Sequence, residues 1–331
     1  MLLYAGIDEA GYGPLLGPLC VACAIIEVTS VDPTVAGTKA PDIWSMLKRA
    51  VCSSPADKRR RIAIADSKLL KGPRDGKEHP LRHLERGVLA VLATQMGSHT
   101  ELVGCDDSLF KMLGVSVNAP DDAPWYASVT VLPVAQERDG ISIAANRLRI
   151  ASTEAGVRFA ALACESLDGV EFNRHAASIQ KSDMNFTMAM RHVDRVWRAY
   201  GVHHPRIIVD RQGGRTHYRE PLQFSFPDAS IAILGETDSV SRYRLERDGT
   251  CITISFETES ESRHFPNALA SMTAKFVREL FMQRMNRFFC GHLPELKPTA
   301  GYVEDGRRYL ADIGPVLKTL KIRSDQLVRC R

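Results

Sequence analysis

The chain has 331 residues, of which 44% are hydrophobic and 25% are charged, and its formal net charge is +4. This composition is typical of a folded soluble protein, and its apolar runs are broken well short of the ~20 residues that span a membrane. The small positive charge permits nucleic-acid binding but excludes a protein that coats nucleic acid by charge alone. The sequence after Met1 lacks the pattern of a signal peptide, so we expect a cytoplasmic protein.

The eight cysteines do not form the pattern of a metal site. Only Cys20 and Cys23 are close in sequence, and they belong to an apolar run at 19–26 that is typical of a strand. Positions three apart in a strand face opposite sides, so these two thiols are not expected to share a metal. We therefore expect reduced thiols and no zinc site.

Two adjacent carboxylates, Asp8 and Glu9, follow an apolar run that begins at Leu2. The next nine residues include three glycines and two prolines, which predicts that a strand gives way to a bent loop. Successive strand residues face opposite ways, so both acids reach one cation only if the backbone distorts after Asp8. The glycines permit that distortion and leave N–H groups open to a phosphate or sugar. The alternative is that the acids merely begin a solvated turn.

The rest of the chain predicts a mixture of strands and helices. Apolar and β-branched runs predict strands at 19–28, 157–164, 205–210, 230–234, 241–245 and 250–256. The first of these would pair with the initial strand as a hairpin, and the Ala-rich 157–164 run leaves a helix open. Helices are predicted at 43–51, 80–92, 182–200, from about 267 onward and at 309–320. Residues 97–150 have few periodic segments, and we interpret them as an insertion of undisclosed function.

Three motifs in order resemble those of one enzyme family. The stretch GIDEAGYGPLLGP at 6–18 resembles the signature of type 2 ribonucleases H, although the family has Arg where this chain has Tyr12. The DSK segment at 66–68, in which Asp66 or Ser67 could cap a helix, resembles the second landmark. The ASMTAKFVR stretch at 270–278 resembles the family's third landmark, a helix.

The resemblance also implies a third and a fourth acid. Asp210 ends the predicted strand 205–210, as the third acid does in the family, but Arg211 follows where the family has a small residue. A catalytic Asp of the family precedes the lysine of the third landmark by fourteen residues, which corresponds here to Glu261. The longer Glu side chain would need a backbone set back by about 1.5 Å.

Other acids could take the fourth position. Glu257 and Glu259 are near enough to replace Glu261 if the segment is out of register. Asp238 would replace it if residues 240–260 were an inserted hairpin. Glu261 is preferred because it keeps the family's spacing to the third landmark.

The resemblance implies an α/β fold of the ribonuclease H-like kind, with a mixed central sheet flanked by helices and with insertions. We expect a catalytic domain at 1–290, which contains the probable insertion at 97–150. A C-terminal helical segment at 291–331 would pack on that domain.

Carboxylate oxygens without a His or Cys set favour Mg²⁺ or Mn²⁺. On the resemblance, Asp8, Glu9, Asp210 and Glu261 would hold two such ions roughly 3.5–4 Å apart. The ions would activate a water molecule and stabilise the leaving 3′ oxygen during phosphodiester hydrolysis.

The resemblance further implies a set of substrate-binding residues. They are Gly11, Tyr12, Gly13, Lys68, Ser271, Lys275, Arg278 and Tyr302. The backbone of the glycine loop would read the ribose 2′-OH, and the cationic side chains would steady phosphates. Tyr302, in the Gly301-Tyr302 pair near the C-terminus, would stack against the sugar, with core packing as its alternative.

The expected function is that of a metal-dependent endonuclease that acts on RNA–DNA hybrids or on ribonucleotides embedded in duplex DNA. One alternative is a nucleic-acid-binding protein without catalysis, which the changes at Tyr12 and Glu261 favour. Another is a nuclease of the same fold that cuts plain DNA or structured RNA. A carboxylate at every required position favours the enzyme.

Overall fold

The computed structural model describes residues 1–32, 39–57, 59–73, 76–95, 102–117, 122–211 and 213–330. Gln212 of the predicted turn lies outside these residues, as do 97–101 and 118–121 of the predicted insertion. Among the described residues, no helix is both long enough and apolar enough to cross a membrane.

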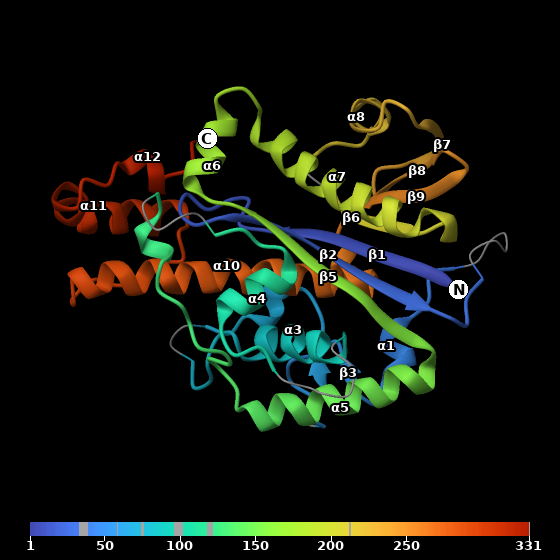
Figure 1. Ribbon diagram of the computed structural model, residues 1–331, viewed down its shortest axis with the longest axis horizontal. Coiled ribbons are helices and arrows are strands. Elements are labelled where there is room, and N and C mark those ends of the chain that lie inside the picture. The colour runs from blue at the N-terminus through green and yellow to red at the C-terminus, as the bar shows by residue number, and fades with distance from the viewer. Residues whose placement is uncertain are drawn as a thin grey trace.

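A seven-stranded mixed sheet runs through the centre of the molecule (Figure 1). Its strand order is β5-β2-β1-β6-β9-β8-β7. The strands are β1 (Leu2–Ala10), β2 (Leu19–Val28), β5 (Val157–Leu167), β6 (Arg206–Asp210), β7 (Ser230–Glu236), β8 (Val240–Arg247) and β9 (Thr250–Glu257). β1 pairs antiparallel with β2 and parallel with β6, and β6 pairs parallel with β9. The short strands β3 (Val51–Cys52) and β4 (Ile62–Ala63) form a separate parallel pair.

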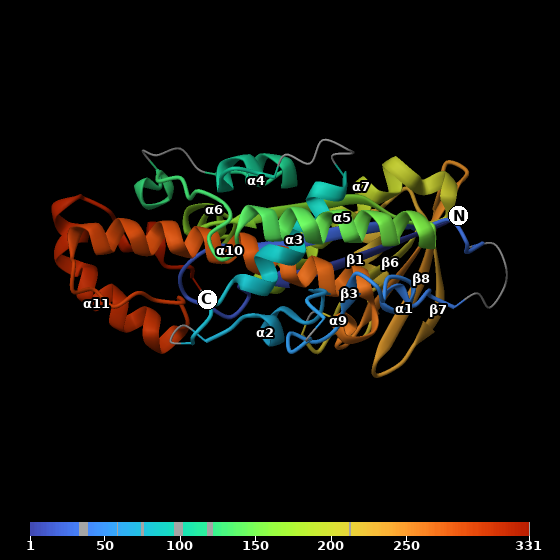
Figure 2. The ribbon, with the colours of Figure 1, turned by 90° about the horizontal axis from the view of Figure 1, so that it is seen from below.

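Helices cover both faces of the sheet, so the predicted α/β architecture is confirmed. In Figures 1 and 2, α7 (Lys181–Tyr200) lies on one face, whereas α10 (Phe265–His292), α3 (Arg82–Gln95) and α5 (Arg138–Ala155) lie on the other. The remaining α-helices are α1 (Ile43–Met46), α2 (Ser67–Leu70), α4 (Asp106–Leu113), α6 (Gly169–Ala176), α8 (Arg219–Ser225), α9 (Ser260–Arg263), α11 (Val303–Thr319) and α12 (Ser324–Leu327). Two short 3-10 helices span Pro124–Tyr126 and Gly201–His203.

The predicted strands are all present, but two predicted boundaries were wrong. β1 continues through Ala10, so Asp8 and Glu9 lie within the strand and not after it. The helix predicted at 43–51 ends at Met46, because Val51 is instead drawn into the pair of β3 with β4. The Ala-rich run that begins at Val157 is a strand, and its pairing with β2 extends it to Leu167.

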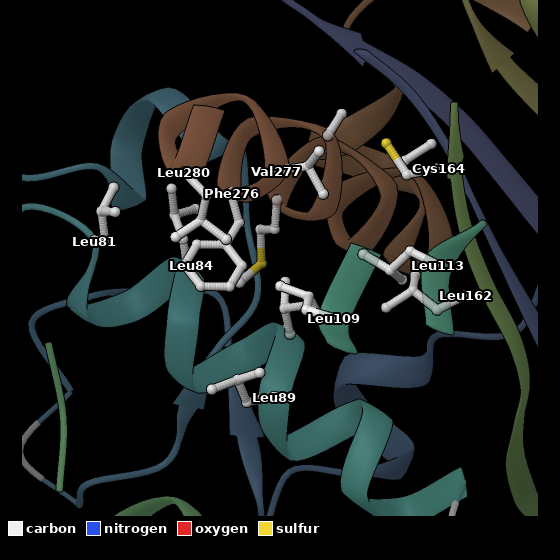
Figure 3. Packing of buried hydrophobic residues seen from close by; sticks show 14 of the residues in the cluster. Leu81, Leu84, Leu89, Leu109, Leu113, Leu162, Cys164, Phe276, Val277 and Leu280 are labelled. Carbon is white, nitrogen blue, oxygen red and sulfur yellow. The ribbon is translucent and has the colours of Figure 1, made fainter. Parts of the chain in front are cut away.

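Helix α10 is the centre of the larger hydrophobic core. Figure 3 shows leucines of α3 and α4 packed around Phe276, Val277 and Leu280 of α10. On α4, Phe110 stacks on Phe281 with ring centroids 4.6 Å apart. A buried ion pair joins the same elements, since Arg284 Nε donates to Asp106 Oδ2 at 2.7 Å. The described part of 97–150 thus shares one core with α10.

The start of α10 lies directly on β1. A Cβ atom at Gly6 would lie 2.2 Å from the backbone nitrogen of Asn267 and 2.4 Å from the carbonyl carbon of Pro266, so no larger residue fits. The side-chain nitrogen of Asn267 donates to the carbonyl oxygens of Ile7 (3.2 Å) and Ile208 (3.1 Å). One buried amide therefore ties the helix to β1 and β6 just before their acidic residues.

We expect Gly6→Ala to lower the free energy of unfolding by about 3 kcal/mol, because the added methyl group overlaps backbone atoms that cannot move aside as a side chain would. Urea denaturation measures this change. The control is Gly140→Ala in α5, where a Cβ meets no atom within 4 Å, and this variant should be neutral or more stable by up to ~1 kcal/mol. Wild-type stability of Gly6→Ala would contradict the close approach of α10.

Candidate active site

Three carboxylates meet where β1 and β6 lie side by side. Each of Asp8, Glu9 and Asp210 offers an oxygen within 4.8 Å of the others. Asp8 faces α10, where the hydroxyl of Ser271 lies beside it, whereas Glu9 faces α7 near Asn185. The two neighbouring acids leave the strand by opposite faces, as strand geometry requires.

Their carboxylates converge without the predicted backbone distortion, so that expectation was wrong. The β1–β2 pairing stays regular through Asp8↔Ala22, Glu9↔Val21 and Ala10↔Cys20. The carboxylate of Asp8 turns back instead and accepts the N–H of Glu9 at 2.7 Å. Side-chain torsions, and not the backbone, bring the acids together.

Asp210 is held by α9. Its Oδ1 atom accepts hydrogen bonds from the Ser260 hydroxyl at 2.8 Å and from the Ser260 N–H at 3.2 Å. The Ser260 hydroxyl in turn accepts from the side-chain nitrogen of Asn267 at 3.1 Å. The carboxylate orientation of Asp210 is therefore fixed through two buried polar side chains.

Glu261 is the nearest of the four alternatives for the fourth acid. It follows Ser260 on α9, and its negative charge raises the pKa of both Asp8 and Glu9. Its Oε2 atom is buried without a hydrogen-bond partner. Glu261 nevertheless lies outside the group of three acids that share the 4.8 Å separation.

The other candidates for that position are near in the chain or the sheet but are exposed or engaged by other groups. Glu257 is buried but bonded to His264 Nε2 at 2.9 Å and ion-paired with Arg263 at 3.3 Å. Glu259 and Asp238 are exposed. None of these three contributes to the shifted pKa values of Asp8 and Glu9.

The acids destabilise one another's charged forms. Burial raises the pKa of Asp8 well above its usual range, and the charges of Asp210 and Glu9 raise it further. Burial, followed by the charge of Asp210, raises the pKa of Glu9 to about 7. Burial also raises the pKa of Asp210, although the hydrogen bonds from Ser260 oppose this. A cation at this place would offset the repulsion.

The second landmark lies beside the acids. Asp66 caps α2 by accepting the N–H of Lys68 at 2.9 Å, as its position predicted. Lys68 is exposed; burial lowers the pKa of its ammonium group, but the charges of Asp66, Glu261 and other site acids outweigh this and raise it. The hydroxyl of Ser271 donates to Ser67 Oγ at 3.0 Å, which links the second and third landmarks.

Two cations of the third landmark point into the protein. Lys275 is buried and pairs with Glu279 at 3.3 Å. Arg278 is 0% exposed and donates to the carbonyl oxygens of Leu16 at 3.0 Å and Ala300 at 3.1 Å. In this structure Arg278 supports the glycine loop from within and does not present its guanidinium to a phosphate.

Two exposed aromatic side chains lie on segments that meet at the glycine loop. Tyr12 is 37% exposed, and the Lys181 ammonium lies 4.4 Å from its ring centroid. Tyr302 is 52% exposed and therefore not a core residue. The carbonyl oxygen of the preceding Gly301 accepts the N–H groups of Leu15 at 2.7 Å and Leu16 at 3.1 Å.

The sequence did not single out several residues that build the site. Arg329 is buried, and its guanidinium donates to the carbonyl oxygens of Gly11 and Pro14. Ser260 and Asn267 were also missed. An asparagine among the apolar residues at the start of a predicted helix is a signal that could have found Asn267.

We expect Glu9→Gln to raise the unfolding temperature of the metal-free protein at pH 8 by about 2 °C or more, and to change it little at pH 5. The folded-state pKa of Glu9, about 7, lies above its usual value of 4.5. Stability is therefore lost as the pH rises from about 4.5 to about 7, the loss is complete at pH 8, and the neutral amide removes it. Calorimetry in chelator at both pH values measures the change. The exposed control Glu259→Gln should change neither value, and equal shifts at both pH values for Glu9→Gln would contradict the assignment.

No model of a known protein family matches the chain, and no curated protein matches its sequence. Solved structures do match it. RNase HII of Archaeoglobus fulgidus, in its complex with PCNA, is 13% identical over 100% of this chain and 95% of that chain, with a TM-score of 0.41. Bst-RNase HIII in complex with Mn²⁺ is 16% identical over 99% of this chain and 66% of that chain, with a TM-score of 0.42. Ribonuclease H2 of Pyrococcus horikoshii OT3 is 11% identical over 98% and 92%, with a TM-score of 0.40. All three are ribonucleases H, the enzymes that the sequence motifs resemble.

Proposed function

We propose that the chain is a divalent-metal-dependent endonuclease that cuts the RNA strand of RNA–DNA hybrids or cuts at ribonucleotides embedded in duplex DNA. The observation that carries the proposal is the convergence of Asp8, Glu9 and Asp210 within 4.8 Å, with Glu261 electrostatically coupled to them. A fold that buries acids which raise one another's pKa loses stability unless cations neutralise those acids. This arrangement supports a metal centre.

The donor set fits Mg²⁺ or Mn²⁺. The three clustered ligand atoms are carboxylate oxygens, and neither His nor Cys belongs to the group that the described residues form. The unpartnered Oε2 atom of Glu261 offers a further oxygen ligand. Ions of this kind, when bound, supply the Lewis acidity that favours attack of water on a phosphodiester.

The chain's own residues would orient the acids and the substrate. Ser260 and Asn267 fix the carboxylate of Asp210 before any ligand arrives. Lys68, whose ammonium is exposed beside the acids, is placed to hold a backbone phosphate. A Cβ atom at Gly13 would meet no protein atom within 4 Å, so the loop is open to the close approach of a sugar.

Exposed aromatic groups support a nucleic-acid substrate. Tyr12 and Tyr302 each have an accessible ring, and such rings stack on unpaired bases and sugars. The ammonium of Lys181 over Tyr12 adds a positive charge at the position where the family has Arg.

The position of Glu261 outside the group of three acids favours the second candidate, a nucleic-acid-binding protein without catalysis.

We expect the wild-type protein, with Mg²⁺ or Mn²⁺, to cut labelled duplexes that carry one ribonucleotide or an all-RNA strand. Asp210→Asn should reduce cutting below detection because it removes a metal ligand. The exposed Asp238→Asn is the matched control and should remain fully active. Binding without cutting of any ribose-containing duplex would overturn the enzyme proposal, and cutting of the all-DNA duplex would assign a different substrate.

The fourth acid is tested by variants at two acids that lie two residues apart in one segment. Glu261→Gln should lower the cutting rate by about 100-fold or more, because an acid coupled to the metal ligands is lost. Glu259→Gln, two residues earlier and exposed, should cut at the wild-type rate. Single-turnover rates measure both. The reverse order of effects would show that Glu261 is not the fourth acid.

A further inference from the structure

A cavity of about 510 Å³ opens on the sheet and is lined by none of the four proposed catalytic acids. Its walls come from β1, β6, β7, β8, β9, the residue that precedes α10 and the segment at 39–40. Its polar lining includes Tyr4, Arg206, Arg242, Ser255, Glu257 and His264. Neither the proposed nuclease reaction nor the three sequence landmarks uses this cavity.

Strand register places the cationic residues on one face. Tyr4 of β1 pairs with Arg206 of β6. Two residues further along β6, Ile208 pairs with Ser255 of β9, and Ser255 also pairs with Arg242 of β8. Side chains two residues apart on a strand share a face, so both arginines project from the same side of the sheet. The alternate residues of these strands, such as Ile207, belong to the core on the other side.

The cavity carries more positive than negative charge. Arg206 and Arg242 are close enough to interact unfavourably, and Lys39 adds a third cation to the lining. Glu257 is the lining acid; it is engaged by Arg263 at 3.3 Å and by His264 at 2.9 Å, and it lies 4.0 Å from Arg242. Adjacent like charges are costly, and an anion between them would offset that cost.

The inner wall is fixed by a buried hydrogen-bonded chain. The Tyr4 hydroxyl bonds to Nδ1 of His264, and Nε2 of the same ring bonds to Glu257. Arg242 is also oriented, since its Nε donates to Ser255 Oγ at 3.0 Å. Both ring nitrogens of His264 are thus engaged, so the cationic groups that face the cavity are those of the arginines.

The size and the apolar part of the lining indicate more than a simple anion. A volume of about 510 Å³ falls within the range of sites for small organic ligands, roughly 300–1,000 Å³. Ile208 and the half-exposed Leu234 supply an apolar wall for an organic group. We propose that this cavity binds a nucleoside monophosphate group, free or at the phosphorylated end of a nucleic-acid strand, with Arg206 and Arg242 on the phosphate.

The test is calorimetric titration with 5′-AMP and with adenosine in chelator, where the acidic site holds no divalent cation. We expect AMP to bind at least about 10-fold more tightly than adenosine, because charge-assisted hydrogen bonds to phosphate are the strong contacts. The double variant Arg206→Gln/Arg242→Gln should lose that preference. Asp210→Asn should keep it, which separates this cavity from the proposed nuclease site. Equal binding of AMP and adenosine would overturn the proposal.

The matched control is Arg244→Gln. Arg244 lies two residues from Arg242 on β8, is ion-paired with Glu246 at 2.6 Å and does not line the cavity, so AMP affinity should be unchanged. If the double variant unfolds, Leu234→Glu replaces it, since a half-exposed residue on the edge strand β7 tolerates a charge. This variant should weaken AMP binding by about 10-fold or more through repulsion. Undiminished AMP binding by a folded variant would overturn the assignment.

A second pair of probes identifies the source of the group. A 5′-phosphorylated single-stranded oligonucleotide is compared with its 5′-hydroxyl counterpart in competition with AMP. Displacement of AMP only by the phosphorylated strand supports a strand end as the natural ligand. Failure of both strands to compete supports a free nucleotide. Equal displacement by both strands would contradict recognition of a terminal phosphate.

Discussion

The side-chain amide of Asn267 is the interaction on which the candidate active site depends. It donates to backbone carbonyl oxygens of β1 and β6 and to the hydroxyl of Ser260, so one buried group ties α10 to two paired strands and to α9. That contact exists only because Gly6 lets α10 approach the strand. The acids Asp8 and Asp210 follow the bonded carbonyls closely in each strand. Their positions are therefore fixed by regular secondary structure, which holds a site more accurately than loops do.

The same anchoring creates an electrostatic cost. Burial, together with the neighbouring acids, shifts the pKa of Asp8 and Glu9 upward, so the metal-free protein holds charges that destabilise its folded state. Ser260 reduces this cost only at Asp210, where its two donors favour the charged form. Folding energy from the core around α10 must therefore hold the acids together. Such local destabilisation is characteristic of functional sites, where a ligand later relieves it.

Local patterns were enough to predict the strands of the central sheet, most of the long helices and the order of the landmarks, because apolar periodicity is a local property, but helix α5 within 97–150 was missed. Contacts between residues far apart in the chain could not be predicted from apolar periodicity. Arg278 matched a motif helix, but its burial beneath the glycine loop depends on packing against residues more than two hundred positions away. The spacing to the third landmark indicated Glu261, yet only the structure shows how the left-handed Glu259 turns α9 so that Ser260 bonds to Asp210.

The glycines of the first motif divide into two kinds. At Gly6, Gly11 and Gly17 a Cβ atom would overlap Asn267, Arg278 and Met282 respectively, and the last two glycines also have φ of +89° and +82°. The fold itself explains why these positions require glycine. Gly13 has an ordinary φ and open space around it, so no contact within the described structure excludes a side chain there. A glycine with no structural requirement is accounted for if a substrate backbone approaches it closely, and this is the point of the loop at which we expect the sugar to be read.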